Sequence, residues 1–200
     1  MKQVASMIKK SHLDKDFQVS VTPEVVNEIN NIRSSEQARS FIRESLQRMK
    51  KYQPIIQEAL NKKSMPNDLL IIPLIESGYQ PLDQSKNPML AAGIWQIIPD
   101  TAKRLGLVIN KNRDDRLNTQ LSTEAAITYL TMNYNQFHDW KLASIAYEIG
   151  EKNTDRLIKQ TGSRDAWVLA NTSSAPTSLK KFVAMFDALL IIMHNPSLVD

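Results

Sequence analysis

The side chain best suited to acid catalysis in this sequence is the carboxyl group of Glu76. It follows the apolar run LLIIPLI at residues 69–75. Apolar surroundings and the negative end of a helix dipole both disfavour a charged carboxylate, and both therefore raise its pKa. A carboxylic acid that stays protonated near neutral pH can protonate the leaving oxygen of a glycosidic bond. Taken alone, however, a glutamate at a helix end more often points to solvent, so this assignment depends on the surrounding residues.

Two further segments combine glycine with aromatic and amide side chains. They are GIWQIIP at residues 93–99 and AYEIG at residues 146–150. Glycine is favoured where the backbone turns through positive φ or is approached closely, and each segment contains one. By themselves, Trp95 and Tyr147 are more typical of core aromatic residues than of a binding site.

Together with ESGY at residues 76–79, these segments resemble the three-part signature of lytic transglycosylases. The type is the soluble-lytic-transglycosylase-like catalytic domain of glycoside hydrolase family 23. Trp95, the sequences YQPI at 52–55 and PNDLL at 66–70, and the final helix around Phe182 are most similar to the branch of membrane-bound lytic murein transglycosylase D. The resemblance covers roughly residues 40–195.

The resemblance implies an all-α, lysozyme-like domain with a glycan-binding cleft that takes bacterial peptidoglycan strands. Glu76 would act first as acid, on the bond between N-acetylmuramic acid and N-acetylglucosamine. It would then act as base on the C6 hydroxyl of the muramic acid, which closes onto C1 to give a 1,6-anhydro end. Assistance by the substrate's own acetamido group explains why one carboxylate suffices.

Four other positions match substrate-binding residues of the family. Ser85 matches a serine in the cleft, and Gln96 matches a glutamine that hydrogen-bonds the sugar. Ile98 matches a position that contributes its backbone carbonyl. Tyr147 matches a tyrosine whose hydroxyl positions the catalytic carboxyl group.

The third motif departs from the family pattern, because Glu148 and Ile149 stand where relatives carry Asn and a small residue. A second carboxylate close to Glu76 would raise the pKa of one of the pair, so Glu148 is a possible modulator of activity. Ser178 stands where many relatives carry a Glu that contacts the peptide stem.

Two alternatives stay open. The changes at Glu148 and Ile149 suit a peptidoglycan-binding or sensor domain with reduced or lost activity. A hydrolytic lysozyme is the other alternative, since Glu148, Asp83 or Asp100 would supply a second carboxylate to activate water.

No cofactor or metal site is indicated. The chain has no Cys, and no His-Glu-x-x-His spacing occurs. The loop DDR at residues 114–116 lacks the EF-hand pattern, and we interpret Arg116 as a structural contact. Lysine pairs are scattered without interleaved aromatic residues, which argues against nucleic-acid binding.

The chain has 200 residues and a formal charge of +4, a mild basic bias. No apolar run approaches the length of a membrane span, and the first ten residues lack the apolar region of a secretory signal. Since the expected substrate lies in the bacterial cell envelope, we expect a periplasmic protein and a mature form or an excised part of a longer envelope protein.

Helical patterns dominate the chain. Thr22-Pro23 and Ser34-Ser35 predict helix starts, and Pro54 predicts another. Apolar stripes at helical spacing predict helices around residues 121–132, 142–149 and 179–193. We expect an N-terminal extension or linker with a short helix at residues 1–35, and a lytic transglycosylase domain at residues 36–200.

Overall fold

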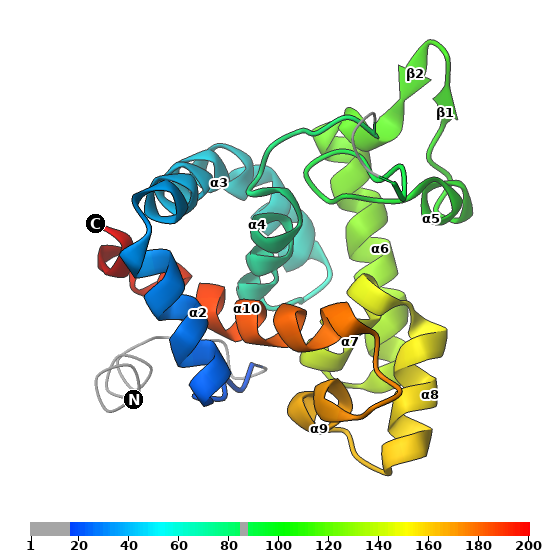
Figure 1. Ribbon diagram of the computed structural model, residues 1–200. Helices are drawn as coiled ribbons and strands as arrows, with labels where there is room; N and C mark the ends of the chain where they lie inside the picture. The colour runs from blue at the N-terminus through cyan, green and yellow to red at the C-terminus, as the bar shows by residue number, and fades with distance from the viewer. Residues whose placement is uncertain (1–16, 85–87) are drawn as a thin grey trace. The chain divides into compact units, whose positions relative to one another are not determined.

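The computed structural model of the chain describes residues 17–84 and 88–200 (Figure 1). Helices dominate these residues, so the all-α prediction is confirmed. The chain forms two compact units. Of the described residues, the first contains 17–31 and Leu130–Asn195, and the second contains those within Ile32–Tyr129 and Pro196–Asp200. The predicted boundary between residues 35 and 36 stays a prediction.

The elements follow one another along the chain as α-helices, short 3-10 helices (η) and one two-stranded antiparallel hairpin. They are α2 Pro23–Ser34, α3 Glu36–Lys62, η1 Asn67–Leu70, α4 Ile71–Ser77, α5 Pro99–Arg104, β1 Ile109–Asn110, β2 Arg113–Asp114, η3 Asp115–Leu117, α6 Thr119–Phe137, α7 Trp140–Ile149, α8 Glu151–Thr161, α9 Ala166–Asn171, α10 Thr177–His194 and η4 Pro196–Val199.

Two predicted helix starts are confirmed by their caps. Helix α2 begins at Pro23, and the Thr22 hydroxyl accepts a hydrogen bond from the backbone N–H of Val25 at 3.4 Å. Helix α3 begins after Ser35, whose hydroxyl accepts from the N–H of Ala38 at 3.2 Å. Such caps satisfy backbone donors that the first turn of a helix leaves without partners.

The helix start predicted at Pro54 is wrong, because Pro54 lies inside the 27-residue helix α3. Proline cannot donate the bond to the carbonyl four residues earlier, here that of Lys50. Both Lys50 and Pro54 are exposed, so water can satisfy that carbonyl. Ile42 on one side of the proline and Ile56 on the other are both buried, and their burial favours one continuous helix.

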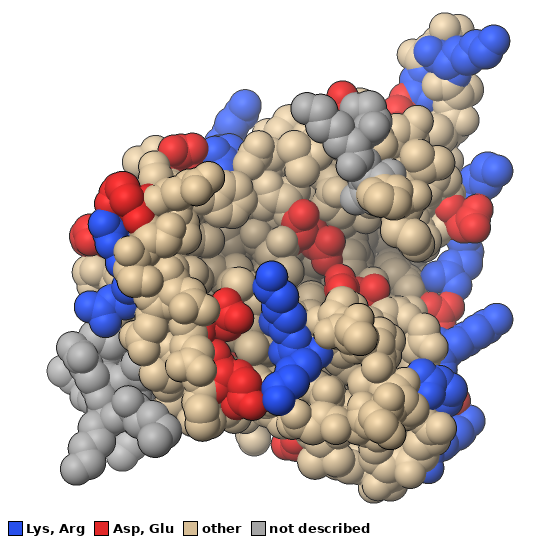
Figure 2. All heavy atoms as spheres, in the orientation of Figure 1, with Lys and Arg blue, Asp and Glu red and all other residues tan. Residues whose placement is uncertain are grey.

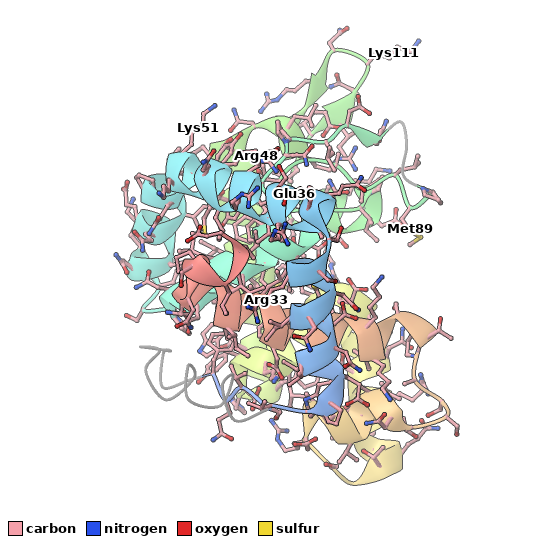
Figure 3. All side chains as sticks on the ribbon, turned by 60° about the vertical axis from the view of Figure 1, so that its left-hand side comes forward. Arg33, Glu36, Arg48, Lys51, Met89 and Lys111 are labelled. Atoms are coloured by element: carbon pink, nitrogen blue, oxygen red, sulfur yellow. The ribbon has the colours of Figure 1, made fainter. Side chains whose placement is uncertain are left out.

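The second unit is built around α3, against which η1, α4 and η4 pack. The shared core is apolar and includes Leu46, Leu60, Leu69, Ile72 and Leu74. The hairpin β1–β2 contacts α5, and Lys111 lies at its tip (Figure 3). This hairpin carried no turn signature of the usual Asn-Gly or Asp-Gly type, and the sequence did not predict it.

The first unit contains α7, α8, α9 and α10, which pack on one another. Helix α10 is buried over most of its length, as its apolar stripe predicted. The segment before α2 joins this unit, since the Phe17 and Phe186 rings lie 5.8 Å apart. The backbone N–H of Ser20 also donates to the carboxylate of Asp187, at 3.3 Å.

Across residues 17–84 and 88–200, none of the helices combines the length and the apolar character that crossing a membrane requires.

Candidate active site

Glu76 lies in the last turn of α4 and is half-buried. The helix ends at Gly78, which adopts left-handed backbone angles (φ 58°). The N–H groups of Gly78 and Tyr79 bond back to the carbonyls of Leu74 and Pro73, both at 3.1 Å. This hydrogen-bonded end fixes the backbone immediately after Glu76.

Helix α3 holds the end of α4 from the side. The Nε of Arg48 (Figure 3) donates to the carbonyl of Gly78 at 2.8 Å, and its terminal nitrogen donates to the Ser45 hydroxyl at 3.0 Å. A Cβ atom on residue 78 would lie 2.5 Å from that hydroxyl oxygen, and this crowding together with the positive φ favours glycine. Helix α3 thus positions the end of the helix that carries Glu76.

Tyr79, the last residue of the first motif, is a structural anchor that the sequence did not reveal. It is fully buried, and its hydroxyl donates to the carbonyl of Leu70 at 2.6 Å. Its ring stacks on Tyr52 with centroids 6.0 Å apart. Burial raises the pKa of Tyr79 far above its ordinary value, so the hydroxyl stays protonated.

Ser77 joins the first motif to the second. Its buried hydroxyl donates to the carbonyl of Ile94 at 2.8 Å. The residue directly after Glu76 is therefore bonded to the turn that carries Gln96. Within the second unit this bond places the end of α4 next to the turn at residues 92–97.

The turn at residues 92–97 is closed by an antiparallel bridge between Ala92 and Ile97. Gln96 is half-buried, has left-handed backbone angles (φ 48°), and donates from Nε2 to the carbonyl of Gly93 at 2.7 Å. Trp95 is fully buried, and its indole N–H donates to the Thr123 hydroxyl at 3.0 Å. The interpretation of Trp95 as a core residue is therefore confirmed.

Ile98 is the residue that precedes α5. Its carbonyl accepts the bond from the N–H of Ala102, at 2.9 Å, that opens this helix. Because a carbonyl oxygen has two lone pairs, this bond is compatible with a second donor. Ser85 lies outside the described residues.

Tyr147 and Glu148 are consecutive residues of α7, in the first unit. Tyr147 is half-buried, whereas the side chain of Glu148 is exposed. The protein around Glu148 nevertheless removes part of its hydration, and this desolvation raises the pKa of the carboxyl group.

Arg116 was interpreted as a structural contact, and that interpretation is confirmed. Its side chain is fully buried and is paired with Asp114, with 2.7 Å between the guanidinium nitrogen and the carboxylate oxygen. In the described part of the chain, no three His, Asp or Glu side chains lie close enough together to hold a metal ion.

The charged surface has no single basic face in the view of Figure 2, where Lys and Arg side chains lie among Asp and Glu side chains and uncharged surface.

Comparison with known proteins agrees with the motifs and their geometry. Residues 53–170, more than half of the chain, match the family described as the Transglycosylase SLT domain. The chain is 32% identical over 162 residues to membrane-bound lytic murein transglycosylase D of Escherichia coli strain K12, and the match covers 78% of this chain and 34% of that protein. It is also 29% identical over 145 residues to a putative tributyltin chloride resistance protein of Alteromonas sp. strain M-1, covering 66% of this chain and 69% of that protein.

The chain therefore belongs to the transglycosylase SLT domain family, whose fold is the lysozyme-like helical one. It spans about a third of the length of the Escherichia coli relative.

Proposed function

We propose that this domain cleaves the glycan strands of peptidoglycan without consuming water, with Glu76 as general acid and then general base. The observation that carries the proposal is the position of Glu76. It lies in the last turn of a short helix whose end is locked by Gly78 and Arg48, and which Ser77 bonds to the turn that carries Gln96.

In the first step, the protonated carboxyl group of Glu76 gives its proton to the glycosidic oxygen between N-acetylmuramic acid and N-acetylglucosamine. The bond from that oxygen to C1 breaks, and the muramic acetamido oxygen assists at C1. In the second step, the Glu76 carboxylate takes the proton of the C6 hydroxyl, whose oxygen closes onto C1 as the acetamido oxygen leaves. Glu76 is protonated again, and the product is a 1,6-anhydro end.

The remaining predicted residues bind and orient the substrate in this proposal. The carboxamide of Gln96 hydrogen-bonds the sugar, Ile98 offers its carbonyl, and Ser85 contributes a hydroxyl. Tyr147 positions the Glu76 carboxyl group through its own hydroxyl.

Peptidoglycan as substrate implies the bacterial cell envelope, and we propose the periplasm as the location. The matched relative in Escherichia coli is named as a membrane-bound murein enzyme, which supports this proposal.

Clearing of a suspension of purified peptidoglycan tests the proposed function. The wild-type domain is expected to lower the turbidity of the suspension. Glu76→Gln is expected to pellet with the wall but to clear it at least about 100-fold more slowly, because the general acid–base group is lost. A wild-type domain that pellets with the wall and never clears it would contradict the enzymatic proposal and favour a binding or sensor domain.

A further inference from the structure

The guanidinium group of Arg116 is the most enclosed charge in the second unit. Its side chain has no exposed surface. One terminal nitrogen donates to the carbonyl of Leu90 at 2.6 Å and to that of Ile97 at 3.0 Å, and the other donates to the side-chain oxygen of Gln84 at 2.7 Å. These three acceptors lie on both sides of the turn that carries Gln96.

Asp114 balances this buried charge. Its carboxylate accepts from Nε of Arg116 at 2.9 Å and from a terminal nitrogen at 2.7 Å, which makes a two-pronged pair. The Arg116 guanidinium holds the pKa of Asp114 below its usual range. Because Asp114 lies in β2, the pair also ties the hairpin to the turn.

The backbone of residue 116 approaches the turn as closely as its side chain does. A Cβ atom on Gly93 would lie 1.9 Å from the carbonyl oxygen of Arg116. The chain at Arg116 therefore lies directly against the first residue of the GIWQ motif, and its side chain reaches the two ends of the same turn.

Two residues in or just before this turn have backbone angles that non-glycine residues rarely adopt, Leu90 at φ 56° and Gln96 at φ 48°. Each such position is strained and persists only where its surroundings hold it. Arg116 bonds to the carbonyl of Leu90 itself and to that of Ile97, the neighbour of Gln96. Its hydrogen bonds therefore act at one strained residue and next to the other.

We propose that Arg116 is a positioning residue for glycan binding. It touches no substrate, but it fixes the backbone that presents Gln96 and the side chain of Gln84, so that the sugar meets a preformed site. The inference rests on the proposed function of Gln96. Only arginine has a planar set of donors that can reach two carbonyls, an amide and a carboxylate at once, whereas lysine offers a point charge.

The test measures the dissociation constant for soluble, uncrosslinked peptidoglycan strands in the Glu76→Gln background, and KM and kcat in the wild-type background. We expect Arg116→Lys to raise the dissociation constant and KM about tenfold or more, with a smaller change in kcat. Without Arg116 the turn that carries Gln96 must be ordered when the glycan binds, and this ordering lowers the affinity. Arg113→Lys is the matched control, since Arg113 is an exposed neighbour that pairs with Asp115 and makes no bond to the turn.

Gln84→Ala keeps the proposal testable if Arg116→Lys does not fold. It removes a single acceptor of Arg116 at a half-exposed position and is expected to raise KM several-fold at an unchanged melting temperature. The proposal would be overturned if a folded Arg116→Lys had the dissociation constant and KM of the wild type. If Arg116→Lys does not fold, unchanged values in Gln84→Ala would overturn it. Clearing of peptidoglycan by Glu76→Gln at the wild-type rate would instead overturn the proposed function.

Discussion

At the residue scale, the carboxyl groups of the motifs carry the chemistry. Glu76 lies at the end of α4, where the family signature predicts the acid–base group. Glu148 follows Tyr147 of the third motif, at the position where the resemblance leads us to expect an Asn. Its pKa is raised by desolvation, so it remains partly protonated at a pH at which an ordinary glutamate is ionised.

Replacement of Glu148 by Asn tests whether it modulates Glu76. If the two carboxyl groups interact, removal of the Glu148 charge lowers the pKa of Glu76. Activity falls at high pH when Glu76 loses its proton, so this limb of the pH profile moves to lower pH. The measurement is the pH dependence of kcat/KM for anhydro-product release. A profile that coincides with that of the wild type would rule out this role.

The same variant has a second expected effect, on stability. When folding raises the pKa of a carboxyl group, the resulting contribution to stability is complete only at a pH below the pKa in the unfolded state. This contribution is lost as the pH rises through the pKa in the folded state. Glu148→Asn is therefore expected to raise the melting temperature relative to the wild type at pH 7 more than at pH 4. The gain is small because the side chain is exposed.

Gly93 is the residue at which the backbone tolerates no side chain. Its φ is 78°, and a Cβ atom would lie 1.9 Å from a backbone oxygen that no rotamer change can move. We expect Gly93→Ala to destabilise the domain by about 3 kcal/mol or more, measured by chemical denaturation. Gly106→Ala is the control, because φ is 82° there but nothing lies within 4 Å of the added carbon. Equal losses in the two variants would contradict the steric explanation.

At the element scale, a buried ion pair joins α7 to α10 in the first unit. Lys141 donates to Asp187 at 2.6 Å, and the carboxylate is fully buried. Burial raises the pKa of Asp187, and the nearby Lys141 opposes that shift. Lys141 also donates to the carbonyl of Gln18 at 3.1 Å, so the pair holds the segment that leads into α2.

Removal of one partner would leave an uncompensated buried charge. Lys141→Met is therefore expected to cost about 3–5 kcal/mol of unfolding free energy, with most of the loss recovered in Lys141→Met/Asp187→Leu. The control is Lys180→Met in the exposed pair with Glu24, which is expected to leave the melting temperature nearly unchanged. A Lys141→Met domain as stable as the wild type would show that the pair contributes nothing.

The elements were predictable where apolar spacing alone decides the structure. The stripe that begins at Leu179 became α10, and the apolar run before Glu76 became α4. The helix start predicted at Pro54 was wrong, because solvent can reach the Lys50 carbonyl that the proline leaves without a hydrogen bond. Prediction also failed at the hairpin, which has no Asn-Gly or Asp-Gly turn. There the Asn110 side chain accepts from the N–H of Asn112 at 2.9 Å, and the Asp115 carboxylate accepts from the N–H of Val108 at 2.8 Å.

The candidate site was predictable only as far as its motifs reach. The positions of Glu76 and Gln96 followed from the resemblance. The contacts that hold them, from Arg48 to Gly78 and from Ser77 to Ile94, join residues far apart in sequence and have no local signal. The role of Tyr79 as a buried anchor was missed for the same reason.

At the scale of the whole molecule, the three motifs are divided between the two compact units. Glu76 and Gln96 belong to the second unit, and Tyr147 and Glu148 belong to the first. Both units are therefore needed for the complete signature. The match to the relative in Escherichia coli covers 78% of this chain and 34% of that protein.

The central claim is that Glu76 performs both proton transfers without water. The most direct test digests purified peptidoglycan with the wild-type domain and with Glu76→Gln, and identifies the released muropeptides by mass spectrometry. We predict that the wild type releases 1,6-anhydro ends, each lighter by one water than a hydrolytic product, and that Glu76→Gln releases none. Reducing ends from the wild type would contradict the account and make the protein a hydrolytic lysozyme with a second carboxylate to be found.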